Sequence, residues 1–222
     1  MKRKVSFWRL NFMKRVLILA LLSFVLAPLS PAFAQSLDQA KAVVESLHQT
    51  MLETMKAAQS GQNFQARYAK LAPALEKNYA FSEMARIASG SHWISFSDDE
   101  KAKITKAYGR MSASTYAARL SGFSGERFET LGAEALPPPA QGVMVSSQIV
   151  RSSGKLVPIS YRVQPSADGF RIVDVYYEGS VSELATQRSQ YLSILRDKGS
   201  AGLLARLEEL SNELAVGKTV GK

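Results

Sequence analysis

The sequence predicts an α+β fold in which helices pack on a small antiparallel sheet of three to four strands and enclose an apolar pocket. Three observations lead to this fold class. Apolar residues recur at helical spacing from residue 36 to about residue 120, change to the pattern of strands after Phe123, and return to helical spacing after residue 182. The chain has 222 residues, which is the length of one domain after removal of a leader.

The first 34 residues have the pattern of a cleaved signal peptide. Six basic residues precede an apolar run at 16–26, and an Ala-Phe-Ala sequence that ends at residue 34 has the small residues of a cleavage site. We therefore expect an exported mature chain that begins at Gln35. An uncleaved membrane anchor is the alternative, but the apolar run is short for the about 20 residues that a span needs.

Removal of the leader changes the charge of the chain. The full sequence has 28 basic and 19 acidic residues and a formal net charge of +9. The leader holds six of the basic residues and none of the acidic ones, so the mature chain keeps 22 against 19, a net charge of +3. No basic stripe with interleaved aromatic residues remains, and we expect no nucleic-acid partner. The absence of cysteine excludes a cysteine nucleophile, thiolate metal ligands and lipidation of a new N-terminal cysteine.

The first part of the mature domain, residues 35–122, is predicted to be mainly helical. Ser36 and Gln39 have the spacing of a capping box for the first helix. An apolar stripe continues along this helix to Met55. His48 lies beside the stripe, and a lone helical histidine is far more often a boundary residue than a metal ligand.

Three more helices are expected in this part of the chain. Residues 64–88 form two of them, which Pro73 separates because proline interrupts the hydrogen bonds of a helix interior. A loop that contains Trp93 follows. Ser97 then caps the third, with an acidic first turn, and this helix runs to about Leu120.

Residues 123–178 are predicted to form the sheet. A short strand is expected at 128–131, and clear strands at 143–150, 156–163 and 170–177, joined by polar turns. The alternation of apolar and polar residues in the strand at 156–163 predicts one buried and one solvent-exposed face. Together they form an antiparallel meander of three to four strands.

Residues 180–215 are predicted to form two helices that cover the sheet. Ser182 caps the first, Gly199 ends it, and a leucine-rich helix follows. This cover either seals against the sheet or leaves a cavity beneath it.

Asp174, in the middle of an apolar strand, is the candidate for a catalytic carboxylate. Cone-shaped folds of the NTF2-like type place Asp or Tyr catalysis in such a pocket, as in ketosteroid isomerase. The other interpretation, which we favour, has Asp174 accept hydrogen bonds from a neighbouring strand or turn. His48 and His92 do not have the spacing of a metal site or a triad, and no phosphate-binding loop or nucleophile elbow is present. We expect no catalytic residue, no metal and no cofactor.

The C-terminal part of the sequence resembles the MlaC family, also called the toluene-tolerance family. The resemblance rests on Ile172-Val173-Asp174-Val175, Glu178-Gly179-Ser180-Val181-Ser182 and Gln187-Arg188-Ser189-Gln190-Tyr191, followed by Gly199 and the leucine-rich helix at 201–215. The phospholipid-shuttle members usually read Gly-Val-Ser and Tyr-Arg-Ser at two of these places. The serine and the glutamine found here are more similar to the hopanoid-associated, HpnM-like branch.

The resemblance implies a periplasmic lipid carrier and not an enzyme. Such a carrier holds the hydrocarbon part of a phospholipid or hopanoid between the sheet and the helices. It exchanges this cargo with an inner-membrane ABC transporter complex and an outer-membrane lipoprotein or porin partner, and so serves the lipid asymmetry of the outer membrane. The apolar residues that we expect to line the pocket are Met84, Trp93, Tyr108, Met111, Val157, Ile159, Tyr161, Ile172, Tyr191 and Ile194.

Other roles also fit the sequence. Arg188 either forms an ion pair with Asp174 or Glu178, which we favour, or faces a lipid head group or a partner protein. A small-molecule enzyme that uses Asp174 is an alternative function for the whole chain. A membrane-anchored scaffold with an uncleaved leader and a solid core is another.

Overall fold

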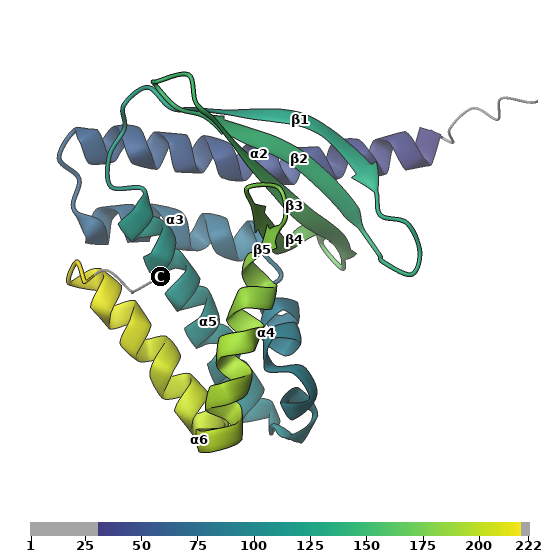
Figure 1. Cartoon of the computed structure of the whole chain (residues 1–222), viewed down its shortest axis with the longest axis vertical. Helices are drawn as coiled ribbons and strands as arrows, with labels where there is room; N and C mark the ends of the chain where they lie inside the picture. The colour runs from purple at the N-terminus through teal and green to yellow at the C-terminus, as the bar shows by residue number, and fades with distance from the viewer. Residues whose placement is uncertain (1–30, 219–222) are drawn as a thin grey trace, which may run out of the picture. The chain divides into compact units, whose positions relative to one another are not determined.

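In the computed structural model, which describes residues 31–218 and the side chains of residues 35–218, an antiparallel sheet forms one layer (Figure 1). Its strands are β1 (Arg127–Ala135), β2 (Val143–Val150), β3 (Leu156–Ser166), β4 (Gly169–Tyr177) and β5 (Val181–Ser182). They lie in the order β1-β2-β3-β4-β5, so strands that are consecutive in sequence are neighbours in the sheet. The predicted meander is confirmed, with five strands in place of three to four, because a two-residue strand such as β5 has no detectable pattern.

β1 is longer than the short strand that the sequence predicts. Its pairing with β2 shifts register between Thr130 and Gly132, which marks a β-bulge. Leu131, at the bulge, is exposed. The bulge interrupts the alternation of apolar and polar residues, and this explains why the pattern predicted only the first half of the strand.

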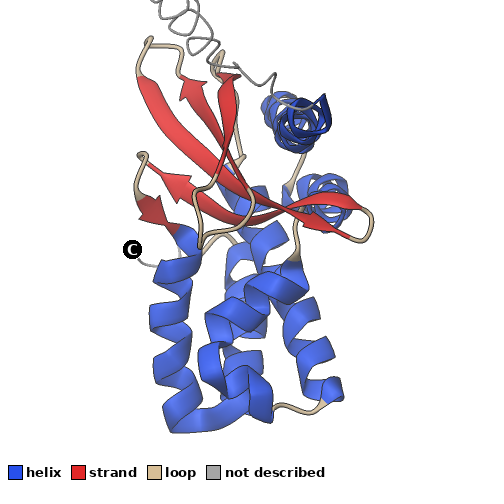
Figure 2. Ribbon diagram, turned by 90° about the vertical axis from the view of Figure 1, so that its right-hand side faces the viewer, coloured by secondary structure: helices blue, strands red, loops and turns tan. Residues whose placement is uncertain are grey.

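Helices cover the sheet and one of its ends (Figures 1 and 2). The described helices are α2 (Pro31–Gln59), α3 (Phe64–Asn78), α4 (Phe81–Ser89), the 3₁₀ helix η1 (Gly90–Ser95), α5 (Asp98–Arg119) and α6 (Glu183–Ala215). α2 lies on one face of the sheet, where the His48 ring stacks on Phe128 of β1 at a centroid distance of 4.5 Å. α4, α5 and α6 pack against one another at the end of the sheet where β4 and β5 lead into α6 (Figure 2). The α+β class predicted from the sequence is confirmed.

The start of α2 differs from the prediction. The helix begins at Pro31, so Ser36 lies inside it and does not cap it. The predicted capping box of Ser36 and Gln39 is therefore wrong, because the residues before Ser36 continue the helix. Residues 1–30 of the predicted leader lie outside the described part of the chain, and cleavage of the leader stays a prediction.

The break between α3 and α4 also lies elsewhere than predicted. Pro73 is inside α3, which continues to Asn78. The chain becomes extended at Tyr79, which forms a parallel bridge with Ile172 of β4, and the Ala80 N–H donates to the Ile172 carbonyl at 2.9 Å. The helix thus ends where its backbone pairs with β4, 93 residues further along the chain, and a local proline signal does not predict that position.

The caps predicted for α5 and α6 are confirmed. The Ser97 N–H donates to Glu100 Oε2 at 2.8 Å and the Glu100 N–H donates to Ser97 Oγ at 3.2 Å, a capping box at the start of α5. Ser182 caps α6 by accepting from the Ala185 N–H at 2.9 Å. Gly199 adopts φ 62° and ψ −164° and kinks α6 at the position where the sequence predicts a helix end.

Gly142, just before β2, occupies a position where only glycine fits. Its φ is 105°, and a Cβ atom there would overlap the carbonyl oxygen of Val163 on β3. We expect Gly142→Ala to lower the free energy of unfolding by about 2 kcal/mol in urea denaturation, because the strained φ and the overlap add. Gly154→Ala is the matched control, since Gly154 has φ 80° with no atom within 4 Å of an added Cβ. An equal loss in the two variants would show that the overlap contributes nothing.

Candidate functional site

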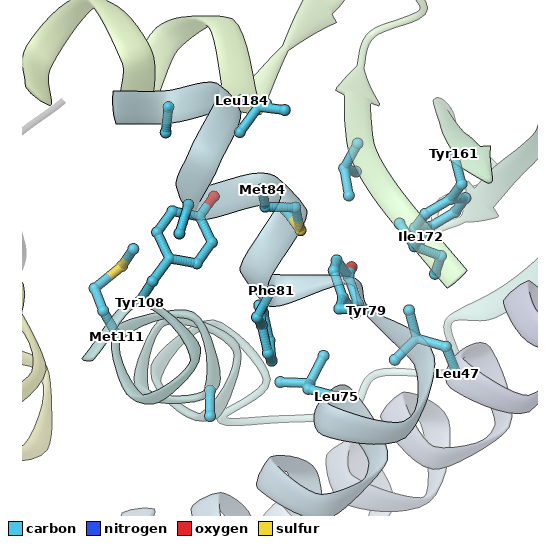
Figure 3. Close-up of a cluster of buried hydrophobic side chains, with 14 of the residues drawn as sticks. Leu47, Leu75, Tyr79, Phe81, Met84, Tyr108, Met111, Tyr161, Ile172 and Leu184 are labelled. Atoms are coloured by element: carbon cyan, nitrogen blue, oxygen red, sulfur yellow. The ribbon is translucent and has the colours of Figure 1, made fainter. Parts of the chain in front are cut away.

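The core is continuous from the helices to the sheet. Figure 3 shows Tyr79, Phe81 and Met84 between Tyr108 of α5 on one side and Ile172 of β4 on the other. The Tyr79 and Phe81 rings stack with centroids 5.6 Å apart. The short link between α3 and α4 therefore carries the aromatic side chains that join the two parts of the core.

A small cavity, which we call the tyrosine cavity, lies where α4, α5, β4 and the start of α6 meet. Its volume is about 30 Å³. The residues that line it are Tyr79, Met84, Tyr108, Met111, Ser112, Thr115, Tyr116, Arg119, Val175, Tyr177, Glu183 and Gln187. A cavity of this size holds about one or two water molecules, so a larger ligand has to move its walls apart.

The hydroxyl groups of the four tyrosines in this cavity are all hydrogen-bonded. Tyr79 Oη and Tyr116 Oη are 2.6 Å apart, and the Tyr108 hydroxyl donates to Gln187 Oε1. The Tyr177 hydroxyl accepts from Arg119 Nη1 at 3.2 Å. Because buried hydroxyl groups are costly only when unpaired, these bonds allow the ring faces to form an apolar wall.

The tyrosines of the cavity remain uncharged over the physiological pH range. Burial raises the pKa of Tyr79, Tyr108 and Tyr116 well above the usual value of 10, and for the first two the negative charge of Glu183 adds to the effect. The tyrosines of the cavity are therefore neutral, hydrogen-bonded groups. This property suits binding of an apolar ligand better than it suits proton transfer.

A larger open groove lies on the far side of Tyr79. This Trp93 groove has a volume of about 740 Å³ and is lined by Glu76, Tyr79, Phe81, Ser82, Trp93, Lys101, Ala102, Thr105, Lys106 and Gly109. Its size is within the range of about 300–1,000 Å³ typical of ligand pockets. Tyr79 lines both the groove and the tyrosine cavity, so the two spaces adjoin at this residue.

The structure brings together part of the predicted set of pocket residues. Met84, Tyr108 and Met111 line the tyrosine cavity. Tyr191 contacts the Tyr108 ring edge-on, at a centroid distance of 6.3 Å and an angle of 89°. Trp93 lines the Trp93 groove instead.

The remaining predicted pocket residues are not among those that line the cavity. Ile159, Tyr161 and Ile172 are buried in the core on the sheet side. Val157 and Ile194 are half-buried. Contact of any of these residues with a ligand stays a prediction.

Nine cavity residues were not predicted from the sequence: Tyr79, Ser112, Thr115, Tyr116, Arg119, Val175, Tyr177, Glu183 and Gln187. One signal was present. Positions 108, 111, 112, 115, 116 and 119 form one face of α5, so Arg119 is the next residue on the stripe that contains Tyr108 and Met111. The residues from the α3–α4 link and from β4 carry no comparable signal, because tertiary structure alone brings them to this face.

Asp174 has a structural role. Its Oδ1 accepts from the Val175 and Leu184 N–H groups at 2.8 and 3.1 Å, and its Oδ2 accepts from the Ser182 hydroxyl at 2.6 Å. The carboxylate thus ties β4 to the N-terminus of α6, which positions Glu183 and Gln187 at the cavity. The interpretation of Asp174 as a hydrogen-bond acceptor for neighbouring segments is confirmed.

Arg188 does not form the ion pair that the sequence favoured. Within residues 35–218, no ion pair joins it to Asp174 or Glu178 at 4.0 Å or less. Its side chain lies over Gly90 instead, with Nη2 3.5 Å from the position that a Cβ of residue 90 would occupy. α6 directs this face toward the α4–η1 junction and away from β4, which is why the pairing prediction was wrong.

The described residues contain no group of three or more His, Asp or Glu side chains that could hold a metal ion. None of the helices in this part of the chain is both long and apolar enough to cross a membrane.

Comparisons with known proteins agree with this architecture. The family model for the MlaC protein matches residues 45–209, from the middle of α2 into α6. A solved structure of the phospholipid-binding protein from Ralstonia solanacearum, in complex with a phospholipid, superposes with a TM-score of 0.67 at 21% identity, covering 81% of this chain and 98% of that one. A comparison with curated proteins finds no match. The family model covers most of this chain, and the chain therefore belongs to the MlaC family.

Proposed function

We propose that this protein is a periplasmic lipid carrier that holds the hydrocarbon part of a membrane lipid in the tyrosine cavity. The observation that carries the proposal is the cavity itself, a space between helices and sheet whose wall includes two methionines and four hydrogen-bonded tyrosines. Membership of the MlaC family supports it, as does the similarity in fold to a protein solved with a phospholipid. Keeping an acyl chain out of water is worth about 0.8 kcal/mol per CH₂ group, which such a wall can supply.

Lipid binding requires the cavity to grow from about 30 Å³. Met84 and Met111 have unbranched, flexible side chains that adapt to ligands of different shape. Rotation of the Tyr79 ring joins the cavity to the Trp93 groove of about 740 Å³. We therefore expect the lipid to widen the cavity as it enters.

The family resemblance supplies the rest of the proposal. The carrier is exported by its leader and exchanges lipid with an inner-membrane ABC transporter complex and an outer-membrane lipoprotein or porin partner. Its cargo is a phospholipid or a hopanoid. Transport needs no covalent step, in keeping with Asp174, whose oxygen atoms are engaged in holding α6.

Native mass spectrometry of the protein purified from a bacterial periplasm, followed by lipid extraction, tests the proposal. We expect a bound lipid, and we expect the purified protein to take up lipid from vesicles that contain a phospholipid or from vesicles that also contain a hopanoid. A ligand-free mass with no uptake from either kind of vesicle would overturn the carrier proposal.

A substitution that fills the cavity locates the binding site. Met111→Trp adds more side-chain volume than a space of about 30 Å³ can accept, so we expect lipid uptake to fall at least tenfold. Met144→Trp is the matched control, since Met144 is half-buried on β2 and does not line the cavity. Circular dichroism verifies that both variants are folded. Wild-type uptake by a folded Met111→Trp variant would place the lipid elsewhere, for example in the Trp93 groove.

A further inference from the structure

Two residues of opposite charge are among those that line the tyrosine cavity. Arg119 is in the last turn of α5, and Glu183 is the first residue of α6. Both line the cavity. Arg119 is exposed and Glu183 half-buried, so the end of the cavity beside Arg119 reaches the protein surface.

Neither charge is neutralised by an ion pair. Among residues 35–218, no ion pair of 4.0 Å or less includes Arg119 or Glu183, and the two are not paired with each other. Arg119 donates through Nη1 to the Tyr177 hydroxyl at 3.2 Å, and its guanidinium lies 5.7 Å from the centroid of that ring. Glu183 Oε1 accepts from Gln187 Nε2 at 3.2 Å. Each group therefore keeps free hydrogen-bonding capacity for a ligand.

A cation and an anion thus line the same cavity, with Arg119 bonded to the Tyr177 hydroxyl and Glu183 at the start of α6. The electrostatics at Tyr177 agree with this placement. Burial raises the pKa of Tyr177, the positive charge of Arg119 lowers it and the negative charge of Glu183 raises it. A guanidinium is the side chain best suited to bind a phosphate oxygen pair, and a carboxylate attracts an ammonium group.

We propose that Arg119 and Glu183 recognise the head group of a zwitterionic phospholipid, with Arg119 on the phosphate and Glu183 on the ammonium group. The lipid chains extend from this end of the cavity toward Tyr79 and the interior. This inference rests on the proposed lipid-carrier function and adds to it the charge class of the lipid. A purely anionic head group meets Glu183 as a like charge, and a lipid without phosphate leaves Arg119 unused.

The test measures which lipids the purified protein extracts from vesicles. The vesicles contain dioleoyl phosphatidylethanolamine, dioleoyl phosphatidylglycerol and dioleoylglycerol in equal amounts, and mass spectrometry counts each lipid bound. We expect wild-type protein to hold phosphatidylethanolamine in roughly tenfold excess over phosphatidylglycerol, because Glu183 attracts the first head group and repels the second. Dioleoylglycerol, with the same chains and no head-group charge, reports on binding by the hydrocarbon part alone.

Two conservative variants separate the roles of the charges. Arg119→Gln is expected to reduce binding of both phospholipids roughly tenfold and to leave dioleoylglycerol unchanged. Glu183→Gln is expected to abolish the preference for phosphatidylethanolamine by increasing the share of phosphatidylglycerol. Arg110→Gln and Glu208→Gln are matched controls on the same two helices, since both residues are exposed and neither lines the tyrosine cavity. These controls are expected to select lipids as wild-type protein does.

Different results would overturn the head-group inference and the carrier proposal. Equal binding of all three lipids by wild-type protein and by both charge variants, with binding lost in Met111→Trp, overturns head-group recognition and leaves the carrier function in place. Absence of every lipid from wild-type protein overturns both. A hopanoid that displaces phosphatidylethanolamine from mixed vesicles also overturns the assignment of a zwitterionic head group.

Discussion

Asp174→Ala is expected to lower the free energy of unfolding by about 3 kcal/mol, because it leaves buried N–H and hydroxyl donors without an acceptor. The carboxylate accepts from the Val175 and Leu184 N–H groups and from the Ser182 hydroxyl. It also lies at the N-terminus of α6, where negative charge is favourable. Urea denaturation followed by circular dichroism measures the loss. Asp174→Asn, which keeps one acceptor oxygen, is expected to lose about half as much.

The matched control for Asp174 is Asp168→Ala. Asp168 is an exposed carboxylate in the turn before β4, 3.6 Å from Arg171, and its removal is expected to change stability by less than about 0.5 kcal/mol. A loss of stability in Asp174→Ala as small as in the control would show that α6 is held by packing alone. Because Asp174 positions Glu183, we also expect Asp174→Asn to weaken the preference among lipid head groups.

Acid is expected to destabilise the protein through His48. This ring is buried between α2 and the sheet, with Nε2 3.0 Å from the Tyr161 hydroxyl, and burial lowers its pKa from 6.5 to about 4. The unfolded chain therefore binds a proton on His48 between pH 6.5 and 4 that the folded protein does not bind. The stabilisation from the neutral ring is present above pH 6.5 and is lost as the pH falls toward 4, by about 3 kcal/mol in total at 1.36 kcal/mol per unit.

His48→Gln separates this effect from the titration of carboxylates. The glutamine side chain can still bond to the Tyr161 hydroxyl but does not titrate. The free energy of unfolding of the variant, relative to that of wild-type protein, is therefore expected to rise by about 3 kcal/mol between pH 7 and pH 4. Urea denaturation at both pH values measures the difference. NMR titration of the His48 ring gives the pKa directly, and a midpoint near 6.5 or parallel pH curves for the two proteins would contradict the expectation.

Features that depend on neighbours in sequence were predictable. The capping box of Ser97 and Glu100 and the cap at Ser182 rest on side chains that reach backbone groups three residues away. Gly199 kinks α6 at the predicted position because its positive φ is a property of that residue type. The strands at 143–150 and 156–163 follow from alternation along a single segment.

Features that depend on contacts between distant segments were not predictable from the sequence. α3 ends at Asn78 because β4 binds the backbone of the next residue, Tyr79, and Pro73 lies inside the helix. Arg188 turns toward Gly90, although Asp174 and Glu178 are nearer in sequence. These outcomes are decided by which elements pack together, and the spacing of residues along one element does not contain that information.

The same division applies to the candidate site. The sequence by itself determined the α+β class, the order of helices and strands, the family, and an apolar stripe on α5 that includes Tyr108 and Met111. Only the tertiary structure decided that Tyr79, Tyr177 and Glu183 join this stripe around one cavity, while Ile159 and Ile172 fill the core. The physical reason is that a residue lining a cavity and a residue filling a core have the same apolar side chains at the same spacing. They differ in what lies opposite them, and the folded chain alone supplies that.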